Sequence, residues 1–403
     1  MNIVILAGGF GTRLQSVVKD VPKPMADING TPFLELLIRE VLLCDPERIV
    51  LCVSYLKEVI EKHFGDNFLG VPILYSEETE PLGTGGAIKR AFDLYDLDEA
   101  VVLNGDTYVQ TDYQAFIEKS AEEKLAVVLK HVGNANRYGQ VQVGNGRIVS
   151  FCEKSPEQTA GLINAGIYKI RRDLFSSGLP EKFSFEKDLL EPEIGKLKPL
   201  YVQADDYFID IGIPESYAQA QRELKQVIFG KPVKKALFLD RDGVINEDKH
   251  HLHKIEDCKF MDGIFDLCRD YKDRGFEIVV VTNQAGIAKG VYTENDYRAL
   301  TAYIHAEFEK QGCPISAEYF CPYHPEGNGR YKRSSFYRKP APGMILRAAK
   351  ELNIDLKQSV LIGDAETDIT AAKTAGVGFT IRLINENNMR GNKQTNADEV
   401  MRV

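Results

Sequence analysis

Short apolar runs alternate with longer amphipathic segments along the first 130 residues of the chain. Uniformly apolar runs are typical of buried β-strands, whereas apolar residues spaced three or four apart are typical of helices. We expect strands at Ile3–Leu6, Ile49–Val53, Ile73–Tyr75, Val101–Leu103 and Ala126–Leu129. We expect helices at Phe33–Cys44 and Tyr55–Phe64. This alternation predicts a parallel α/β sheet with helices on both faces.

The pattern restarts after a long helical stretch at Glu215–Ile228. The next segment, FGKPVKK at Phe229–Lys235, has the glycine, proline and lysines of a linker. Three all-apolar strands follow it, within KALFLD, EIVVVTN and SVLIGD, and each ends in a polar turn. We therefore expect two domains, residues 1–230 and residues 231–403, each large enough for its own hydrophobic core.

Composition narrows the class of protein. The 403 residues are 44% hydrophobic and 27% charged, which is typical of a soluble globular protein. The formal net charge of −9 argues against non-specific nucleic-acid binding, which needs a basic surface. The seven cysteines are odd in number and scattered, which fits a reducing compartment. With no basic signal-peptide lead and no apolar run near ~18 residues, we expect a cytoplasmic protein that does not contact the membrane.

Glycine-rich turns follow two of the expected strands in the first domain. Ligands of open parallel sheets bind at the carboxyl ends of the strands, so these turns are candidate sites. The segment LAGGFGTRL, Leu6–Leu14, can surround a phosphate with backbone N–H groups, and Arg13 adds a positive charge. The segment EPLGTGGAI, Glu80–Ile88, opens a helix where an anion or a base edge could bind. A tight strand–helix turn explains the first loop equally well, and the P-loop pattern is absent.

Two aspartates of the first domain stand just past apolar strands, Asp106 in VVLNGDTYV and Asp210 in FIDIGIPESY. A carboxylate in this position is poorly solvated unless a cation accompanies it. Two carboxylates with Mg2+ between them suit triphosphate chemistry, because the metal neutralises phosphate oxygens. Each aspartate taken alone is as readily a helix N-cap or a turn residue.

The motifs LAGGFGTRL, PKPM, EPLGTGGA, LNGD, EK, NAG and DIG-x-PE-x-Y occur in this order and resemble the sugar-1-phosphate nucleotidyltransferases over residues 1–228. The stretch SVVKDVPKPMADINGTPFLELLI is most similar to the D-glycero-α-D-manno-heptose 1-phosphate guanylyltransferases. The resemblance implies a Rossmann-like (GT-A-like) mixed sheet. It also implies that a sugar 1-phosphate oxygen attacks the α-phosphorus of a nucleoside triphosphate and releases pyrophosphate, by positioning and charge.

The same resemblance implies roles for individual residues. The base would be lined by Leu6, Ala7, Gly8 and Gly9. The triphosphate would be held by Gly11, Thr12 and Arg13, and the transition-state charge would be stabilised by Lys23. Mg2+ would be bound by Asp106 and Asp210. The sugar phosphate would be held by Gly85, Glu153, Lys154 and Asn164.

The second domain opens on a pair of carboxylates, Asp240 and Asp242 in ALFLDRDGVIN. Residues i and i+2 of an extended chain point the same way, and neighbouring carboxylates repel unless a cation or a shared proton separates them. This pattern favours one nucleophile on a metal and one proton donor. A surface turn is the alternative, since Asp and Gly are turn formers, but the preceding ALFL run disfavours it.

Three later strand ends supply matching groups. The Thr282 hydroxyl in VVVTNQAG suits a phosphoryl oxygen, and YRKPAPGM offers the charges of Arg338 and Lys339. The segment VLIGDAETD offers Asp364 and Asp368 as a second carboxylate pair for a metal. Together these motifs resemble the haloacid-dehalogenase (HAD) superfamily phosphatases. Residues 235–385 are similar to the D-glycero-D-manno-heptose 1,7-bisphosphate phosphatases and their histidinol-phosphatase relatives.

That second resemblance implies a HAD-like Rossmannoid parallel sheet and a phospho-aspartyl intermediate on Asp240, with Asp242 as acid and then base. Mg2+ would be held by Asp240, the Asp242 backbone carbonyl and Asp364, so Mg2+ is expected in both domains. Thr282 and Lys339 would stabilise the phosphoryl group, and Arg338 would select the substrate. The pocket would be lined by Asp248, His250, His251, Asn283 and Gln284. Ala365 departs from the pattern, because heptose phosphatases often carry a substrate-contacting lysine there.

The loop CPYHPEGNGRYKRSSFYRKP, Cys321–Pro340, at first suggests half a zinc site. In zinc-bearing relatives this loop carries a CxH pair and then a CxC pair before RKP. Here Cys321 is in register, but Tyr323 fills the second ligand position and His324 comes one residue late. Ser335 and Tyr337 replace the final pair. A structural zinc site needs four N or S ligands, so no zinc is expected. The loop would be held by packing of Tyr323, Tyr331, Phe336 and Tyr337.

Both domains thus point to heptose phosphates. The phosphatase would remove the 7-phosphate of D-glycero-α-D-manno-heptose 1,7-bisphosphate, and the transferase would activate the product with GTP for surface-glycan assembly. One alternative is another sugar 1-phosphate, such as that of mannose or another hexose with GTP or dTTP, beside a histidinol-phosphatase-like domain. A second alternative is that one domain is non-catalytic. The expected partners are small molecules, and the sequence leaves a homo-oligomer open.

Overall fold

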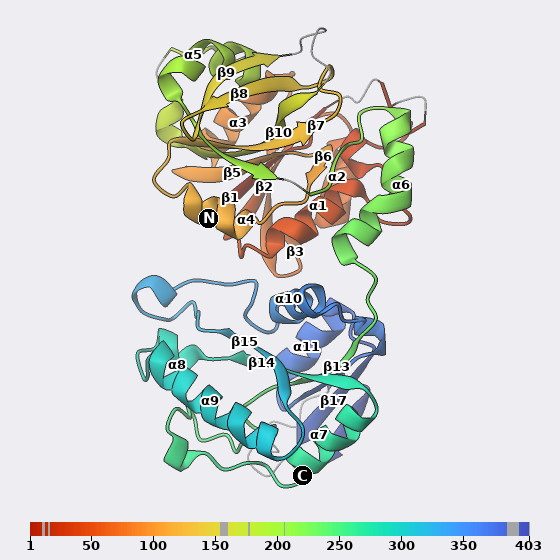
Figure 1. Ribbon diagram of the computed structural model, residues 1–403, viewed down its shortest axis with the longest axis vertical. Helices are drawn as coiled ribbons and strands as arrows, with labels where there is room; N and C mark the ends of the chain where they lie inside the picture. Colours follow the sequence, from red (N-terminus) through yellow and green to blue (C-terminus); the bar gives the residue numbers. More distant parts are fainter. Residues whose placement is uncertain are drawn as a thin grey trace. The chain divides into compact units, whose positions relative to one another are not determined.

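The computed structural model of the chain describes residues 1–9, 13–14, 17–153, 160–175, 178–204, 206–384 and 395–402. These residues form two compact units, Met1–Ile228 and Phe229–Val403, each with its own main sheet (Figure 1). Along the chain, helix α6 (Pro214–Phe229) ends the first unit and strand β13 (Lys235–Leu239) is the first strand of the second. The expected division at residues 230 and 231 falls in this connection.

The main sheet of the first unit has the strand order β3-β4-β2-β1-β5-β10-β7-β11-β9-β8. Its strands are β1 (Asn2–Leu6), β2 (Arg48–Val53), β3 (Asn67–Phe68), β4 (Val71–Glu77), β5 (Glu99–Asn104), β7 (Leu125–Val132), β8 (Gly139–Gly144), β9 (Arg147–Glu153), β10 (Gly161–Arg171) and β11 (Leu200–Ala204). A separate small sheet pairs β6 (Thr107–Val109) with β12 (Phe208–Asp210) in antiparallel register.

The five strands that the sequence predicts for this unit, which correspond to β1, β2, β4, β5 and β7, are parallel to one another, but the sheet also contains antiparallel strands that the local pattern did not predict. Strand β10 runs antiparallel to both β5 and β7. Strands β8 and β9 form a hairpin around Asn145–Gly146, with no helix between them, and such a direct connection makes strands antiparallel. The strand–helix alternation ends near β7, so the mixed sheet that the family resemblance implies is confirmed.

The first unit also contains α-, 3-10 and π-helical segments. They are η1 (Lys23–Met25), α1 (Phe33–Leu42), α2 (Lys57–Phe64), α3 (Gly83–Leu94), α4 (Tyr113–Lys119), η2 (Arg172–Leu174), η3 (Phe185–Leu190, a π-helix), α5 (Glu191–Leu197) and α6. On one sheet face, Phe92 of α3 and Leu190 of η3 join a buried cluster with Val102 of β5. Burying each such side chain contributes about 1.5–3 kcal/mol, so this cluster is the main support of α3 and the segment after it.

The second unit has a six-stranded parallel sheet among its described residues, in the order β15-β14-β13-β16-β17-β18. Its strands after β13 are β14 (Phe276–Asn283), β15 (Ile315–Cys321), β16 (Val360–Gly363), β17 (Phe379–Ile384) and β18 (Glu399–Arg402). Its helices are η4 (Ile255–Asp257), α7 (Ile264–Asp273), α8 (Ala285–Ala288), α9 (Glu294–Lys310), η5 (Gly329–Tyr331), α10 (Gly343–Leu352), η6 (Leu356–Gln358) and α11 (Glu366–Ala375).

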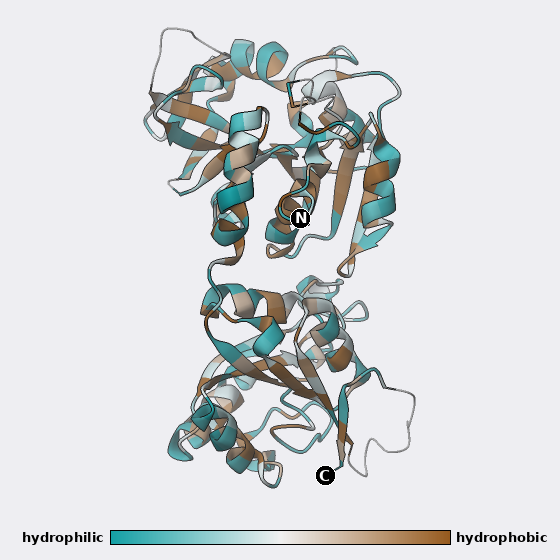
Figure 2. Ribbon diagram, turned by 90° about the vertical axis from the view of Figure 1, so that its right-hand side faces the viewer, coloured by the Kyte–Doolittle hydropathy of each residue, from teal (hydrophilic) through white to brown (hydrophobic). Residues whose placement is uncertain are grey.

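Helices cover both faces of the second sheet (Figure 1). Leu237 and Leu239 of β13 face a cluster that includes α7 and α9, whereas Phe238 faces α10 and α11. Because side chains alternate along a strand and both faces of this sheet are covered, β13 is apolar at every position from Ala236 to Leu239. Brown strands inside each unit and teal on the outward helix surfaces show the same division in Figure 2. Every helix among the described residues is too short or too polar to traverse a lipid bilayer.

Candidate active sites

Two adjoining cavities open at the carboxyl ends of β1 and β5 in the first unit. One, of about 200 Å3, is lined in part by Arg13, Asn164 and Asp210. The other, of about 300 Å3, is lined in part by the glycine loop after β1 and the turn before α3. Lys23, Asn104 and Asp106 line both cavities, so they stand where the two spaces meet. After the roles that the family resemblance implies for their lining residues, we call the second space the base cavity and the first the phosphate cavity.

Lys23 joins the two predicted metal ligands of this unit. Its ammonium lies 2.5 Å from an Asp106 oxygen and 3.3 Å from an Asp210 oxygen. The three residues come from distant segments: the pairing of β6 with β12 brings Asp106 and Asp210 together by placing Asp210 opposite Thr107, and Lys23 is the first residue of η1. Arg137 approaches the second Asp210 oxygen at 3.5 Å. Two carboxylates and two cations therefore face one cavity, an arrangement suited to charge-dense phosphate groups.

Some of the other residues predicted for this unit line a cavity, and others do not. Leu6, Gly8 and Gly9 line the base cavity, whereas Ala7 is buried and its N–H donates to the Cys52 carbonyl at 2.8 Å. Asn164 lines the phosphate cavity and donates to the Tyr168 hydroxyl at 2.6 Å. The predicted residues Gly11, Thr12 and Lys154, and the side chain of Glu153, lie outside the described part of the chain.

Gly85 lines neither of these cavities. Its N–H donates to the Phe183 carbonyl at 3.0 Å. A Cβ added at this glycine would lie 2.1 Å from the Phe183 ring, well inside van der Waals contact. The glycine therefore permits close packing of α3 against the segment before η3.

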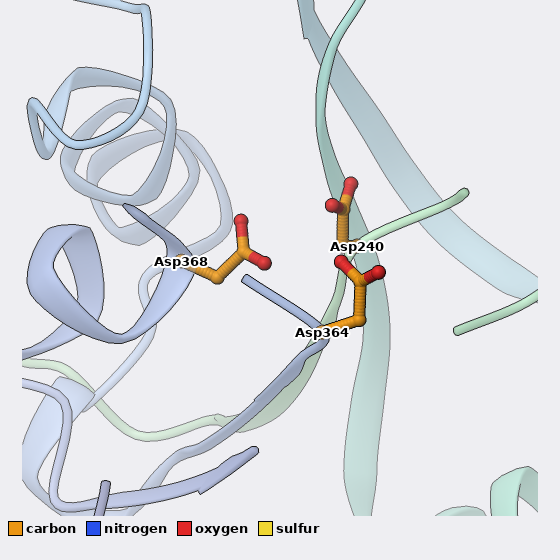
Figure 3. A group of neighbouring side chains, drawn as sticks. All are labelled: Asp240, Asp364 and Asp368. Atoms are coloured by element: carbon orange, nitrogen blue, oxygen red, sulfur yellow. The ribbon is translucent and has the colours of Figure 1, made fainter. Parts of the chain in front are cut away.

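Three carboxylates converge in the second unit (Figure 3). Asp240 follows β13, Asp364 follows β16 and Asp368 lies in the first turn of α11, and one oxygen of each lies within 4.8 Å of the others. Neighbouring parallel strands that end at one edge bring the first two together. Gly243 lies against Asp364, because a Cβ there would be 2.4 Å from a carboxylate oxygen.

Lys339 is the cation that reaches this cluster. Its side chain is buried, and its ammonium lies 2.9 Å from Asp240 and 2.7 Å from Asp368. It also donates to the Val281 carbonyl at 2.7 Å. Burial lowers the pKa of Lys339, but the attraction of Asp240 and Asp368 outweighs burial, so the net direction is upward. The lysine is therefore held charged between two buried carboxylates.

The cluster carries more negative charge than Lys339 neutralises. Burial raises the pKa of Asp364 to about 8, and repulsion from Asp240 and Asp368 adds to the rise. Burial also raises the pKa of Asp240 to about 6, although Lys339 opposes the rise. Burial and mutual repulsion both oppose ionisation of these carboxylates. A divalent cation such as Mg2+ binds carboxylate oxygens and offsets that repulsion, so the residues present fit a metal.

Asp242 is not one of the three clustered carboxylates, and hydrogen bonds fix its side chain. Its carboxylate accepts from Arg241 at 2.9 Å, from Asn246 at 2.9 Å and from Gln284 at 3.2 Å. Arg241 is only 1% exposed and stacks over the Tyr297 ring, with its carbon 5.6 Å from the ring centre. The carboxylate therefore has a fixed orientation beside Asp240, which a proton donor requires.

The remaining predicted residues surround the carboxylates at different depths. Thr282 and Gln284 are buried, and the Gln284 amide donates to the Thr282 hydroxyl at 2.9 Å. The same amide donates to Asp242, so Gln284 orients this carboxylate and is not exposed to a pocket. Asn283 bonds the backbone N–H and carbonyl of Lys339 at 3.1 and 3.0 Å, which fixes the lysine segment. Arg338 is half-buried, and burial lowers its pKa.

The loop between β13 and α7 brings three further predicted residues to this unit. Asp248 and His250 are exposed, and Asp248 accepts the His250 N–H at 2.9 Å. His250 and His251 both adopt positive φ angles, 50° and 71°. The charge of Asp248 adds to the rise in the pKa of Asp364, so this loop lies near the carboxylate cluster.

The loop that suggested zinc is held by packing, as expected. Phe336 is buried, Tyr323 and Tyr331 have ring centres 6.1 Å apart, and Arg333 covers Tyr323 at 3.8 Å. The Nδ1 atom of His324 accepts the Glu326 N–H at 3.1 Å. Among the described residues, the sole group with metal-ligand spacing is the three aspartates, and Cys321 and His324 are not part of it.

Comparison with known proteins identifies the first unit. Residues 2–227, more than half of the chain, match the nucleotidyl transferase family. The chain belongs to this family. Over 218 residues it is 46% identical to D-glycero-α-D-manno-heptose 1-phosphate guanylyltransferase of Campylobacter jejuni, which covers 54% of this chain and 97% of the relative. The crystal structure of HddC from Yersinia pseudotuberculosis is 40% identical, with a TM-score of 0.50, and covers 55% of this chain and 99% of that one.

The second unit is similar to a different family of proteins. Residues 336–381 match the HAD-hydrolase-like family. Over 150 residues the chain is 51% identical to D-glycero-α-D-manno-heptose-1,7-bisphosphate 7-phosphatase of Burkholderia mallei, which covers 37% of this chain and 79% of the relative. Both predicted resemblances and both predicted fold classes are therefore confirmed. The chain is an enzyme with a nucleotidyl transferase unit and a HAD phosphatase unit.

Three side chains near these sites were absent from the sequence prediction. Arg137 and Glu186 line the phosphate cavity of the nucleotidyl transferase unit, and Glu78 lines its base cavity. Arg137 comes two residues before the glycine of RYGQ, and that glycine is a loop signal that could have drawn attention to it. Glu78 lies in the acidic run SEETE, where sequence alone indicates a solvated surface.

Proposed function

We propose that the chain catalyses two consecutive steps on one sugar. The HAD unit removes the 7-phosphate of D-glycero-α-D-manno-heptose 1,7-bisphosphate, and the nucleotidyl transferase unit then transfers GMP from GTP to the remaining 1-phosphate. The observation that carries this proposal is that each unit independently matches relatives named for a heptose phosphate, and that the product of one is the substrate of the other. We place both reactions in the cytoplasm.

In the phosphatase step, an Asp240 oxygen attacks the 7-phosphorus and the sugar oxygen leaves with a proton from Asp242. Asp242 then removes a proton from water, whose oxygen displaces Asp240 and yields inorganic phosphate. Lys339 keeps positive charge beside the reacting aspartate. Asp240, Asp364 and the Asp242 carbonyl would hold Mg2+. When bound, Mg2+ would neutralise charge on the phosphoryl oxygens.

In the transfer step, an oxygen of the sugar 1-phosphate attacks the α-phosphorus of GTP, and pyrophosphate leaves from the opposite side. Lys23 and Arg13 line the phosphate cavity and stabilise the charge that builds up on the phosphate oxygens. Asp106 and Asp210 would hold Mg2+, which would neutralise part of the triphosphate charge. No residue needs to form a covalent bond in this step.

Product analysis tests the proposal directly. The protein is given heptose 1,7-bisphosphate, GTP and Mg2+, and the expected products are inorganic phosphate, pyrophosphate and GDP-heptose. The variant Asp240→Asn should stop phosphate release but still release pyrophosphate from heptose 1-phosphate, and Lys23→Met should give the reverse. A panel of hexose 1-phosphates with four nucleotides serves as the comparison. Failure to release pyrophosphate from heptose 1-phosphate and GTP would overturn the proposal.

A further inference from the structure

A short chain of hydrogen bonds leads from a buried tyrosine to two residues of the phosphatase site. The Tyr292 hydroxyl donates to Oε1 of Gln284 at 2.5 Å. The Nε2 group of Gln284 donates to the Thr282 hydroxyl at 2.9 Å and to an Asp242 oxygen at 3.2 Å. The family resemblance gives catalytic roles to Thr282 and Asp242 but none to Tyr292.

The direction of this chain follows from the groups at its ends. Asp242 pairs with the buried Arg241 at 2.9 Å, and a carboxylate can only accept hydrogen bonds. The NH2 group of the Gln284 amide must therefore face Asp242, because the carbonyl oxygen would repel it. The carbonyl oxygen, which can only accept, then faces Tyr292. Burial raises the pKa of Tyr292 to about 12, so the phenol keeps the proton that it donates.

This direction leaves the Thr282 hydroxyl with its own proton to donate. The two protons of the Gln284 NH2 group are taken up by Thr282 and Asp242. A hydroxyl that accepts one hydrogen bond can still donate another. Among the described residues, no protein group accepts the Thr282 proton. The proton is therefore available to an oxygen of the phosphoryl group that Asp240 attacks.

The fold fixes the Tyr292 ring from more than one side. Tyr292 is 6% exposed and belongs to a small buried cluster of apolar side chains. The His253 ring stacks on it nearly parallel, with ring centres 5.2 Å apart. A Cβ added at Gly286 would lie 2.1 Å from the Tyr292 ring, so this glycine makes room for it. The hydroxyl is therefore presented to Gln284 from a fixed position.

Gln284 depends on Tyr292 because its amide is buried. Gln284 is 1% exposed, and among the described residues the Tyr292 hydroxyl is the donor to its carbonyl oxygen. A buried carbonyl oxygen without a donor is unfavourable, so without Tyr292 the amide would turn or shift toward another partner. Either movement takes the amide protons away from Thr282 and Asp242.

We propose that Tyr292 is a positioning residue of the phosphatase unit, which holds the Gln284 amide so that Asp242 stays aligned and Thr282 keeps its proton for the phosphoryl group. This inference rests on the proposed function, because it takes Asp242 as the proton donor and Thr282 as a phosphoryl contact. It adds a residue that acts on the reaction through Gln284 and touches no reacting atom.

A double-mutant cycle tests this chain. Initial rates of phosphate release from heptose 1,7-bisphosphate with Mg2+ give kcat and KM for the full chain and its variants. Tyr292→Phe keeps the ring but removes the donor, so kcat should fall about 10-fold while KM stays within about 2-fold. Gln284→Met removes the amide at similar volume and should lower kcat at least as much. In the Gln284→Met background, Tyr292→Phe should change kcat by less than about 2-fold, because the group it acts through is gone.

Tyr271 provides a matched control in the same unit. It is 8% exposed, and its ring packs edge-on against Phe276, which begins β14, whereas Thr282 lies near the end of that strand. Tyr271→Phe thus removes a tyrosine hydroxyl of similar burial beside the other end of the same strand. It should retain wild-type kcat and KM. Melting temperature and guanylyl transfer by the full chain report whether each variant is folded.

The outcomes separate the inference from the function beneath it. A folded Tyr292→Phe protein with wild-type kcat would overturn the role of Tyr292 while leaving the phosphatase function intact. An equal loss of kcat from Tyr292→Phe in both backgrounds would also overturn it, because the tyrosine would then act by a route other than Gln284. A wild type that releases no phosphate from heptose 1,7-bisphosphate would instead overturn the proposed function and the inference together.

Discussion

Replacing Lys339 by methionine should destabilise the second unit strongly. The lysine is 3% exposed and bonds two buried carboxylates, Asp240 and Asp368, at 2.9 and 2.7 Å. Methionine fills a similar volume but leaves both carboxylates without their cation. Removing one partner of a buried ion pair costs about 3–5 kcal/mol, because the remaining charge is not solvated.

This free energy corresponds to a large change in melting temperature. The unit spans 229–403, a size for which 1 kcal/mol shifts Tm by roughly 2–4 °C. The expected decrease is therefore about 6–20 °C. The decrease in Tm should be larger at pH 8 than at pH 5, because loss of the lysine raises the pKa values of the two carboxylates further. A carboxyl group whose pKa is raised in the folded state destabilises the folded unit as the pH rises.

Differential scanning calorimetry of the full chain in EDTA measures this change. Lys332→Met is the matched control, because Lys332 is exposed, and it should shift stability by less than about 0.5 kcal/mol. Adding Asp368→Asn to Lys339→Met should recover part of the loss, because one of the two uncompensated charges is removed. A Lys339→Met protein that melts with wild type at both pH values would refute the view that the lysine neutralises buried charge.

Three further predictions follow from the same structure. Without divalent cations, the stability of the second unit should fall between pH ~4 and ~8, because Asp240 and Asp364 bind protons more tightly in the folded state than in the unfolded state. Mg2+ should therefore raise Tm more at pH 8 than at pH 5. A Tm that rises with pH in EDTA would contradict this. Elemental analysis should find no stoichiometric zinc, whereas one equivalent would show that the Cys321 loop binds it. Gly85→Ala should cost about 1–3 kcal/mol by overpacking against Phe183, measured by urea unfolding; unchanged stability would show that the ring moves freely.

The sequence predicted those features that depend on local pattern. Apolar runs located the central strands, and the carboxyl ends of those strands located Asp106, Asp240 and Asp364. Each of these inferences needs only that a buried strand is apolar and that a parallel sheet gathers its strand ends. The hairpin around Asn145–Gly146 carried a local signal too, since this dipeptide is typical of a two-residue turn.

Features that depend on distant pairing or on burial could not be derived from the local pattern. Asp106 and Asp210 meet because two three-residue strands pair; strands so short have no readable periodicity, so the two aspartates were paired only through the family resemblance. An arginine between two aspartates is typical of an exposed turn, yet Arg241 is buried and pairs with Asp242. Glu78 looks like any residue of an acidic run until the fold places it against Gly8.

The contact between Gly85 and Phe183 also affects how the two positions evolve. Any side chain at position 85 would collide with the aromatic ring, so tolerance at one position depends on the residue at the other. A larger residue at 85 becomes accessible only after a smaller residue has appeared at 183, which makes the pair epistatic. Selection could therefore retain this glycine inside a binding motif even if substrate never touches it, and mutational intolerance at position 85 would not identify a ligand contact.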